Sequence, residues 1–505
     1  MIEAEVHTTL RAFLRARADL TWPHHLTMAR LVARALRLGR PALVQTGSAR
    51  GYCLSYLASA LLWDGPVLLV APKTVRQRLL AVHIPRLQEW LQTDKPICSG
   101  DRLDDPQFRG LMLVKPADWL GDRLGDGSRF GDGVPTLIDR AEDLEDWTRR
   151  HLGATLDAAA WNLALATCPT WRDRLRQARV RLTKTLFERP RNPYNCHLLD
   201  APETEVLYPL LQTLAATGQL SALPAFEQYW QQWRSPTEQL LWADVDRMAG
   251  HVSLHCAPAV VSDRLAPVWQ RQPVVLVGGF LDWETAAPVY RQQLGLGDLT
   301  CLRFAPDRHT ECVRLYLPDR LPLPNSPQFR DALLRQLRAL FDRAPRNRAI
   351  VVLVGDVPLK AQVAATLAAE RGTRVQLERG DLAPDSILVT GWEFWRKRQE
   401  TLPTPHLLVV ATLPLPSLEH PLVAGRVNYY RRRRLDWFRL YLLPTALREL
   451  QRAIAPVREA NGVVALLDNR VIHRSYGRLV LAALEPCARA NFLDGVGLGE
   501  EIYGP

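Results

Sequence analysis

The stretch VQTGSARGYCLSYLASALL, residues 44–62, decides the fold of this 505-residue chain. An apolar run leads into a turn with two glycines, and the turn leads into a sequence with helical periodicity. A strand, a glycine-containing turn and a helix in this order form a phosphate loop, whose backbone N–H groups and helix N-terminus hold an anion. Such a loop also needs a lysine and a serine or threonine hydroxyl, and neither is present. The stretch therefore predicts the backbone of a phosphate loop without its usual side chains.

Short apolar runs bounded by proline and glycine recur on both sides of this stretch. They are too short for helices and read as buried strands of parallel sheets, with helical stretches between them. This alternation predicts two doubly wound α/β series. The runs lie at 41–47, 66–72, 111–116, 135–139 and 273–280, and then at 350–356, 387–391, 407–416 and 462–468. Residues 317–327 are rich in proline and predict a linker between the two series.

Between the first four runs and the fifth, the composition changes. Residues 151–245 are rich in Trp, Leu, Gln and Arg and poor in strand signals, which predicts a helical insertion. Their aromatic residues could stack on bases, but the helical spacing favours a packed core. The predicted organisation is a helical extension at 1–22, a first lobe at 23–150 and 246–316, the insertion at 151–245, a second lobe at 328–490 and a tail at 491–505.

The bulk composition narrows the classes of partner. The formal net charge is +11 and the pI about 9.4, which favours a polyanion, nucleic acid before membrane, although an arginine-rich proteome gives the same signal. The eight cysteines are scattered and none are at a CxxC spacing, so the sequence predicts no zinc site. Scattered cysteines in a chain of this size indicate a reducing compartment. Without a signal-like N-terminus or a membrane-length apolar run, the sequence predicts a cytoplasmic protein that binds no metal.

The motifs of the first series resemble, in order, those of the DinG/XPD-like superfamily-two DNA helicases. The opening stretch resembles their loop A-G-T-G-T-G-K-[ST]-L-x-Y-L-x-P-A-L. The match puts Tyr52 on the lysine position and Cys53 on the serine or threonine position. PTLIDRAEDLED (135–146) resembles the D-E-A-H box. The nucleotide-binding positions that the resemblance gives in the loop are Gly47, Ser48, Arg50, Gly51, Tyr52 and Cys53, and the box positions are Asp139, Arg140 in place of Glu, and Glu142 in place of His.

The second series continues the resemblance. LPLPSLEHPLVAGR (413–426) resembles the family's L-P-F-P-x-x-x-D-P-L-V-x-A-R. LPTALRELQRAIAPVREANGVVALLD (443–468) resembles L-P-x-A-x-x-x-L-K-Q-G-x-G-R-x-I-R followed by G-V-V-x-x-L-D. Gln451 and Arg458 fall on polar nucleotide-binding positions of that motif, and Ala455 occupies the arginine that would touch the γ-phosphate. The resemblance covers about residues 22–490.

This resemblance implies two RecA-like P-loop NTPase lobes, each a parallel sheet flanked by helices, with an arch-like insertion in the first lobe. The family also carries an iron–sulphur cluster on four cysteines between the loop and the D-E-A-H box. This chain has only Cys98 between Cys53 and Asp139, and a cluster needs about four thiolates. We therefore expect no iron–sulphur cluster.

The substitutions bear on ATP hydrolysis, which depends on positioning and electrostatics. Tyr52 is neutral where the lysine should be, and the Cys53 thiol is a soft ligand where magnesium needs a hydroxyl. Arg140 puts a cation on a carboxylate position, and Ala455 removes the arginine. Together these substitutions make turnover unfavourable, and no cofactor is expected. One alternative is an active ATP- and magnesium-dependent helicase in which Arg50 replaces the lysine and Glu142 acts as base. We expect both of these side chains to be exposed to solvent instead. Another alternative is a structural protein that binds a partner through the 151–245 insertion.

Nucleic-acid binding depends on distributed cations and survives such losses more easily. Single-stranded DNA is the partner that the resemblance implies. The run Arg431–Arg434 is the densest positive charge in the chain and fits a phosphate contact as well as a solvated helix face. The candidate contacts are Lys73, Arg76, Arg396, Lys397, Arg426, Arg431, Arg432, Arg433 and Arg434.

Overall fold

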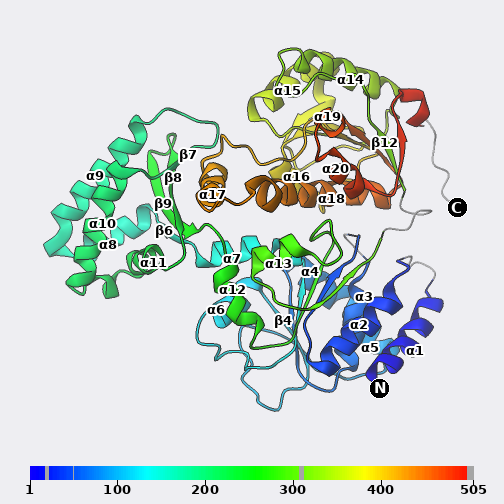
Figure 1. The fold of residues 1–505 in the computed structure, drawn as a ribbon, viewed down its shortest axis with the longest axis horizontal. Helices are drawn as coiled ribbons and strands as arrows, with labels where there is room; N and C mark the ends of the chain where they lie inside the picture. The colour runs from blue at the N-terminus through cyan, green and yellow to red at the C-terminus, as the bar shows by residue number, and fades with distance from the viewer. Residues whose placement is uncertain (18–21, 49–50, 306–311, 497–505) are drawn as a thin grey trace.

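A computed structural model describes residues 1–17, 22–48, 51–305 and 312–496, which form two sheet-centred lobes and a third body beside them (Figure 1). The sheet of the first lobe has seven parallel strands in the order β11-β1-β10-β5-β2-β4-β3. Its central strands are wholly buried, as expected for continuous apolar runs covered on both faces. The strands are β1 (Ala42–Gln45), β2 (Val67–Val70), β3 (Ile97–Ser99), β4 (Leu111–Val114), β5 (Thr136–Asp139), β10 (Val274–Gly278) and β11 (Thr300–Arg303).

Helices cover both faces of this sheet. One face packs against α1 (Ile2–Arg15), α2 (His25–Leu38), α3 (Cys53–Leu62) and α5 (Ile84–Leu91). The other packs against α6 (Pro116–Arg123), α7 (Leu144–Leu152), α12 (Ser262–Trp269) and α13 (Pro288–Leu294). The predicted N-terminal extension at 1–22 contains α1, which buries Val6, Leu10 and Phe13 in the core of the first lobe, while its residues 18–21 lie outside the described residues. It is therefore an integral part of that lobe.

The second lobe repeats this arrangement with a seven-stranded parallel sheet in the order β14-β15-β13-β16-β17-β12-β18. Helices α14 (Phe329–Arg343) and α15 (Val357–Arg371) cover one face, and α16 (Trp392–Arg398), α18 (Leu443–Glu459) and α20 (Gly477–Leu484) cover the other. The strands are β12 (Val313–Tyr316), β13 (Ile350–Leu353), β14 (Val375–Leu377), β15 (Ile387–Thr390), β16 (Leu407–Val410), β17 (Val463–Leu466) and β18 (Cys487–Ala490).

Strand β12 corrects the predicted boundary between the lobes. The first lobe was expected to extend to residue 316, but β12 lies between β17 and β18 of the second sheet. The chain therefore passes between the lobes after β11, and the proline-rich stretch at 317–327 lies within the second lobe. A run of four mostly apolar residues predicts a buried strand. Such a short run does not indicate which of the two sheets the strand joins.

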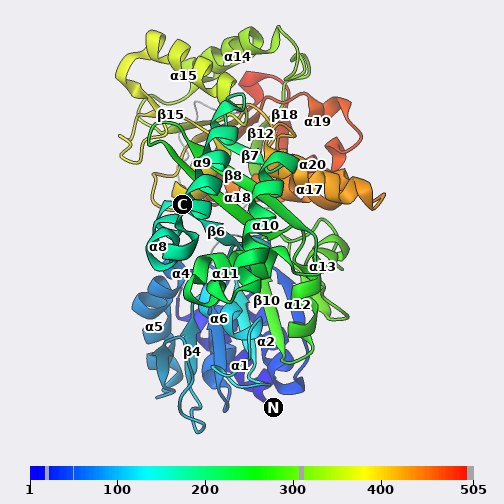
Figure 2. The same cartoon turned by 90° about the vertical axis from the view of Figure 1, so that its left-hand side faces the viewer.

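The insertion also differs from its prediction, because it is not wholly helical. It combines α8 (Ala158–Thr167), α9 (Arg172–Glu188), α10 (Ala201–Ala216) and α11 (Pro224–Trp233) with a four-stranded antiparallel sheet in the order β6-β9-β8-β7 (Figure 2). The predicted end at residue 245 falls inside a hairpin. The strands are β6 (Ala154–Leu156), β7 (Cys196–Leu198), β8 (Gln239–Asp246) and β9 (His251–Pro258). Trp161, Phe226 and Trp230 pack in the core of the insertion.

The second lobe touches the insertion through α17 (Pro421–Arg432). This helix lies against β7 and β8 (Figure 1). Its Val423 and Val427 share an apolar cluster with Leu240 of β8. The approach is close at Gly425, where a Cβ atom would lie 3.0 Å from a methyl carbon of Leu240. The insertion therefore emerges from the first lobe and contacts the second.

No helix in the described part of the chain is both long enough and apolar enough to cross a membrane.

Candidate functional site between the lobes

The turn after β1 leads to Tyr52, whose ring is buried with 3% of its surface exposed. Its hydroxyl donates a 2.7 Å hydrogen bond to Oδ1 of Asp139, the last residue of β5. One helical turn further on, the hydroxyl of Tyr56 donates to Oδ2 of the same carboxylate at 2.8 Å. The backbone N–H of Arg140 also donates to Oδ1, at 2.8 Å. Both carboxylate oxygens of Asp139 are thus hydrogen-bonded within the protein.

Burial keeps the phenol and thiol groups beside this carboxylate neutral. Burial, reinforced by the charge of Asp139, raises the pKa of the Tyr52 and Tyr56 phenols well above the usual value. Burial likewise raises the pKa of the Cys53 thiol to about 12. Cys53 is therefore a neutral thiol at physiological pH, and a neutral thiol is a poor ligand for magnesium, which prefers hard oxygen atoms.

The turn itself folds onto the end of β10. The backbone N–H groups of Thr46 and Gly47 donate to the carbonyls of Gly278 and Gly279, at 2.8 and 3.0 Å. Gly47 has a φ of +66°, a conformation that favours glycine. These two N–H groups are therefore used within the sheet edge. Of the predicted loop residues, Arg50 lies outside the described residues, so its proposed substitution for a lysine stays a prediction.

The turn faces α18 of the second lobe across a narrow cleft. Gly47 and Ser48 line one side, and Gln451, Arg452 and Arg458 line the other. The part of the cleft beside this turn leaves about 30 Å³ of space for the centres of water molecules. That is enough for about two waters, whereas small-molecule sites measure roughly 300 Å³ or more.

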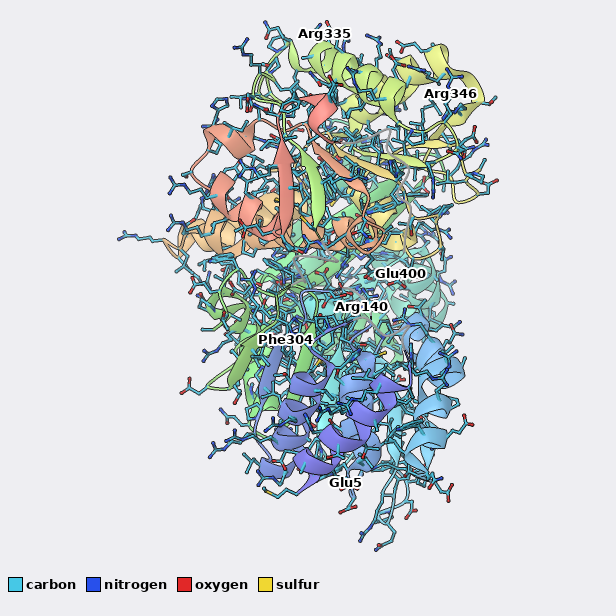
Figure 3. All side chains as sticks on the ribbon, turned by 90° about the vertical axis from the view of Figure 1, so that its right-hand side faces the viewer. Glu5, Arg140, Phe304, Arg335, Arg346 and Glu400 are labelled. Carbon is cyan, nitrogen blue, oxygen red and sulfur yellow. The ribbon has the colours of Figure 1, made fainter. Side chains whose placement is uncertain are left out.

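Arginines and carboxylates join the two lobes across this cleft. Arg140 of the first lobe pairs with Glu400, which follows α16 in the second (Figure 3). Arg452 of α18 lies 2.6 Å from a carboxylate oxygen of Asp143 and 3.9 Å from one of Glu142. The expectation that Glu142 is exposed is wrong. Its side chain is 10% exposed, and burial raises its pKa.

Glu145 at the start of α7 is the centre of this network. Its carboxylate lies 2.5 Å from Arg426 of α17 and 3.8 Å from Arg448 of α18. Arg149 of its own helix lies at 2.6 Å. Burial alone would raise the pKa of Glu145, but Arg426, Arg149 and Arg448 outweigh burial and lower it. We call the pairs that cross the cleft the inter-lobe network; they are Arg140–Glu400, Arg452–Glu142, Arg452–Asp143, Arg426–Glu145, Arg448–Glu145 and Arg396–Asp146.

Comparisons with known proteins give the fold and sequence relatives. No family model matches the chain. The ATP-dependent DNA helicase YoaA of Escherichia coli is 24% identical over 256 residues, and that of Haemophilus influenzae is 23% identical over 258. Each match covers 48% of this chain and only 40% of the relative. An apo XPD structure superposes with a TM-score of 0.62 at 12% identity, and the match covers 92% of this chain and 100% of that structure. The structure of S. tokodaii Xpd4 superposes with a TM-score of 0.61 at 12% identity, and the match covers 92% of this chain and 99% of that structure.

The chain is similar in sequence to the YoaA helicases and shares the fold of XPD.

In this DinG/XPD-like chain, the two parallel sheets are RecA-like lobes with the P-loop NTPase fold. Tyr52 and Cys53, on the positions of the loop lysine and hydroxyl, form the buried start of α3 beside Asp139. Ala455 lines the cleft, and Arg458 donates to the carbonyl of Leu484 in its own lobe at 2.8 Å.

The residues at this site do not fit a magnesium ion, and the cysteines of the chain do not fit an iron–sulphur cluster. Asp139 lies on the box position whose carboxylate holds magnesium in P-loop NTPases, and both of its oxygens are engaged by Tyr52, Tyr56 and a backbone N–H. Among the described residues, no group of three His, Cys, Asp or Glu side chains is placed to hold a metal ion. The eight cysteines are free and scattered over the fold, so they do not offer the four thiolates of an iron–sulphur cluster.

The predicted nucleic-acid contacts of this DinG/XPD-like chain divide into two groups. Arg426 is buried against Glu145 and lies over the Tyr441 ring at 3.9 Å. Arg396 lies 3.4 Å from Glu449, within its own lobe, and 3.8 Å from Asp146. The structure thus uses these two cations inside the protein.

The other predicted contacts lie nearer the surface. Arg432 and Arg433 both pair with Glu238 of the insertion, Arg431 lies over the ring of Trp437 at 5.1 Å, and Lys397 pairs with Glu393 at 2.6 Å. Arg76 donates to the carbonyl of Ala71 at 3.1 Å. Lys73 and Arg434 are exposed. These surface residues are the ones available to an external anion.

Sequence reasoning missed Tyr56, Glu145, Glu400 and Arg448 as members of the site. The family loop has a tyrosine at the position of Tyr56, which was a usable signal. The acidic run EDLED at 142–146 was another, because it faces arginines at the same cleft.

Proposed function

We propose that this chain is a nucleic-acid-binding pseudo-helicase that does not hydrolyse ATP efficiently. The observation that carries the proposal is the hydrogen bond from Tyr52 to Asp139. A hydrolysing motor of this fold needs a lysine on the phosphates and a carboxylate free to hold magnesium. Here one buried ring occupies the lysine position and engages that carboxylate.

The cleft supports the same conclusion. Phosphates beside the turn would have to enter a space that holds about two waters, and they would have to displace ion pairs of the inter-lobe network. Arg452, which could offer a positive charge to phosphate, already contacts Asp143 at 2.6 Å. An active enzyme would require the Tyr52 ring to leave its buried position and Arg452 to leave its carboxylate partners.

Nucleic-acid binding is supported by charge and by the relatives. The chain carries a formal net charge of +11, and Lys73 and Arg434 are exposed. YoaA, the sequence relative, is named as an ATP-dependent DNA helicase. We therefore propose single-stranded DNA as the ligand, held through phosphate contacts that weaken steeply with salt.

The test measures phosphate release from ATP and magnesium, with and without single-stranded DNA, beside Escherichia coli YoaA as the positive control. We expect no DNA-stimulated release from this chain, and we expect salt-sensitive binding of a fluorescent oligothymidine. DNA-stimulated release would overturn the pseudo-helicase. Absence of DNA binding at low salt, where binding should be strongest, would instead favour a purely structural protein.

A further inference from the structure

Positive charge is concentrated on one helix of the insertion. Residues 172–191, which contain α9, carry eight Lys or Arg and two Asp or Glu. The rest of 151–258 carries two Lys or Arg and eight Asp or Glu. The insertion is therefore close to neutral as a whole, and most of its positive charge lies in this one segment.

The basic side chains of α9 form rows on its solvent side. Leu175, Leu182 and Leu186 point into the core of the insertion. Arg172, Arg176 and Arg179 follow one another at spacings of four and three residues, so they share one face of the helix. The helix thus presents a cationic edge that flanks its apolar face.

The acidic residues on α9 do not neutralise this edge. Asp173 lies 3.8 Å from Arg176, and Glu188 lies 3.9 Å from Lys184. All four side chains are more than 60% exposed. Ion pairs this exposed are worth little and exchange readily for other partners.

A groove runs beside this edge, between α9, α8 and the turn that joins β8 to β9. Its volume is about 380 Å³, compared with about 30 and about 160 Å³ in the two parts of the inter-lobe cleft. The lining combines the basic side chains of Arg179, Lys184 and His251 with the exposed Val180, and the buried Trp161 and Leu254 lie beneath them. Val180 is 61% exposed, which leaves apolar surface next to the cations.

We infer that this groove, the α9 groove, binds a strand of single-stranded nucleic acid in addition to any contact made by the lobes. A single strand offers regularly spaced phosphates and flat apolar bases, which match a row of cations beside the exposed side chain of Val180 and the exposed imidazole of His251. The inference rests on the proposed function and extends it to a second surface. An acidic, apolar peptide segment shares part of this chemistry, but the repeated row of cations favours a regular polyanion.

The experiment measures the affinity of the full chain for a fluorescent oligothymidine over a range of salt concentrations. The test variant is Arg179→Glu with Lys184→Glu. The control variant, Arg335→Glu with Arg346→Glu, makes the same charge change on exposed residues of the second lobe, on and just beyond α14 (Figure 3). We expect the test variant to bind about tenfold more weakly and to lose about 1.4 from the slope of log affinity against log salt, because each phosphate contact on a single strand contributes about 0.7. The control should change both far less.

The outcomes separate the two proposals. If the test variant and the control bind alike, the α9 groove does not bind DNA, while the proposed function stands. If the unmodified chain does not bind the oligothymidine at low salt, both proposals fail. If the test variant keeps its DNA affinity but loses binding to a Glu-rich peptide with apolar residues, the groove is a peptide site. Equal melting temperatures for all three proteins would show that the charge reversals act on binding and not on folding.

Discussion

Arginine serves two different purposes in the inter-lobe cleft and on α9. In the cleft, Arg426 is 8% exposed and lies 2.5 Å from Glu145. On α9, the side chain of Arg176 is 64% exposed and its one acidic neighbour is 3.8 Å away. The same residue type therefore holds the protein together in one place and stays available to an outside anion in the other. The net charge calculated from the sequence does not distinguish the buried arginines of the cleft from the exposed arginines of α9.

The energetic reason for the difference is desolvation. A buried charge that loses its partner costs several kcal/mol, whereas an exposed pair contributes about 1 kcal/mol or less. Changes in the cleft should therefore act on stability, and changes on α9 should act on binding. This contrast can be tested by mutation.

The largest effect is expected for Glu145→Ala. The change leaves Arg426 and Arg448 without their shared carboxylate inside the cleft, which costs about 3–5 kcal/mol. Urea unfolding measures the free energy. The control is Glu205→Ala on α10, an exposed site where the change should stay within about 0.5 kcal/mol. Equal stabilities of the two variants would show that the inter-lobe network does not hold the lobes.

A smaller effect is expected for Tyr52→Phe. Oδ1 of Asp139 keeps the backbone N–H of Arg140 but loses the phenol donor, which costs about 1–3 kcal/mol. Tyr208→Phe, where the tyrosine is 40% exposed on α10, is the matched control and should be close to neutral. The measurement is again urea unfolding. A Tyr52→Phe protein as stable as the control would mean that the hydrogen bond contributes nothing to the fold.

The smallest effect is expected from pH. The pKa of Glu145 is lower in the folded chain than in the unfolded chain. Its stabilising contribution is therefore complete above the ordinary carboxylate pKa and is lost as the pH falls towards the folded value. The difference in unfolding free energy between the native protein and Glu145→Gln should accordingly be smaller at pH 3.5 than at pH 7. A difference that grows on acidification would contradict the charged state assigned to Glu145.

Local sequence was enough for much of the fold. The apolar runs at 41–47 and 273–280 contain neighbouring strands, and the family resemblance put Tyr52 and Asp139 on positions that meet at one site. Their hydrogen bond was beyond sequence reasoning, because it joins residues 87 positions apart and depends on where the tyrosine ring points. Long-range partners also explain the errors over Glu142 and β12. In each case the residue type was compatible with two environments, and only tertiary packing chose between them.

The contact of α17 with β8 has a consequence for how the molecule can be divided. The crossover after β11 looks like a place to cut the chain into two autonomous pieces. A fragment ending there would expose the apolar surface around Leu240, and its counterpart would expose Val423 and Val427. Each fragment would then expose an apolar patch that favours self-association. The contact between α17 and β8 therefore makes each half of the chain depend on the other to keep this surface buried.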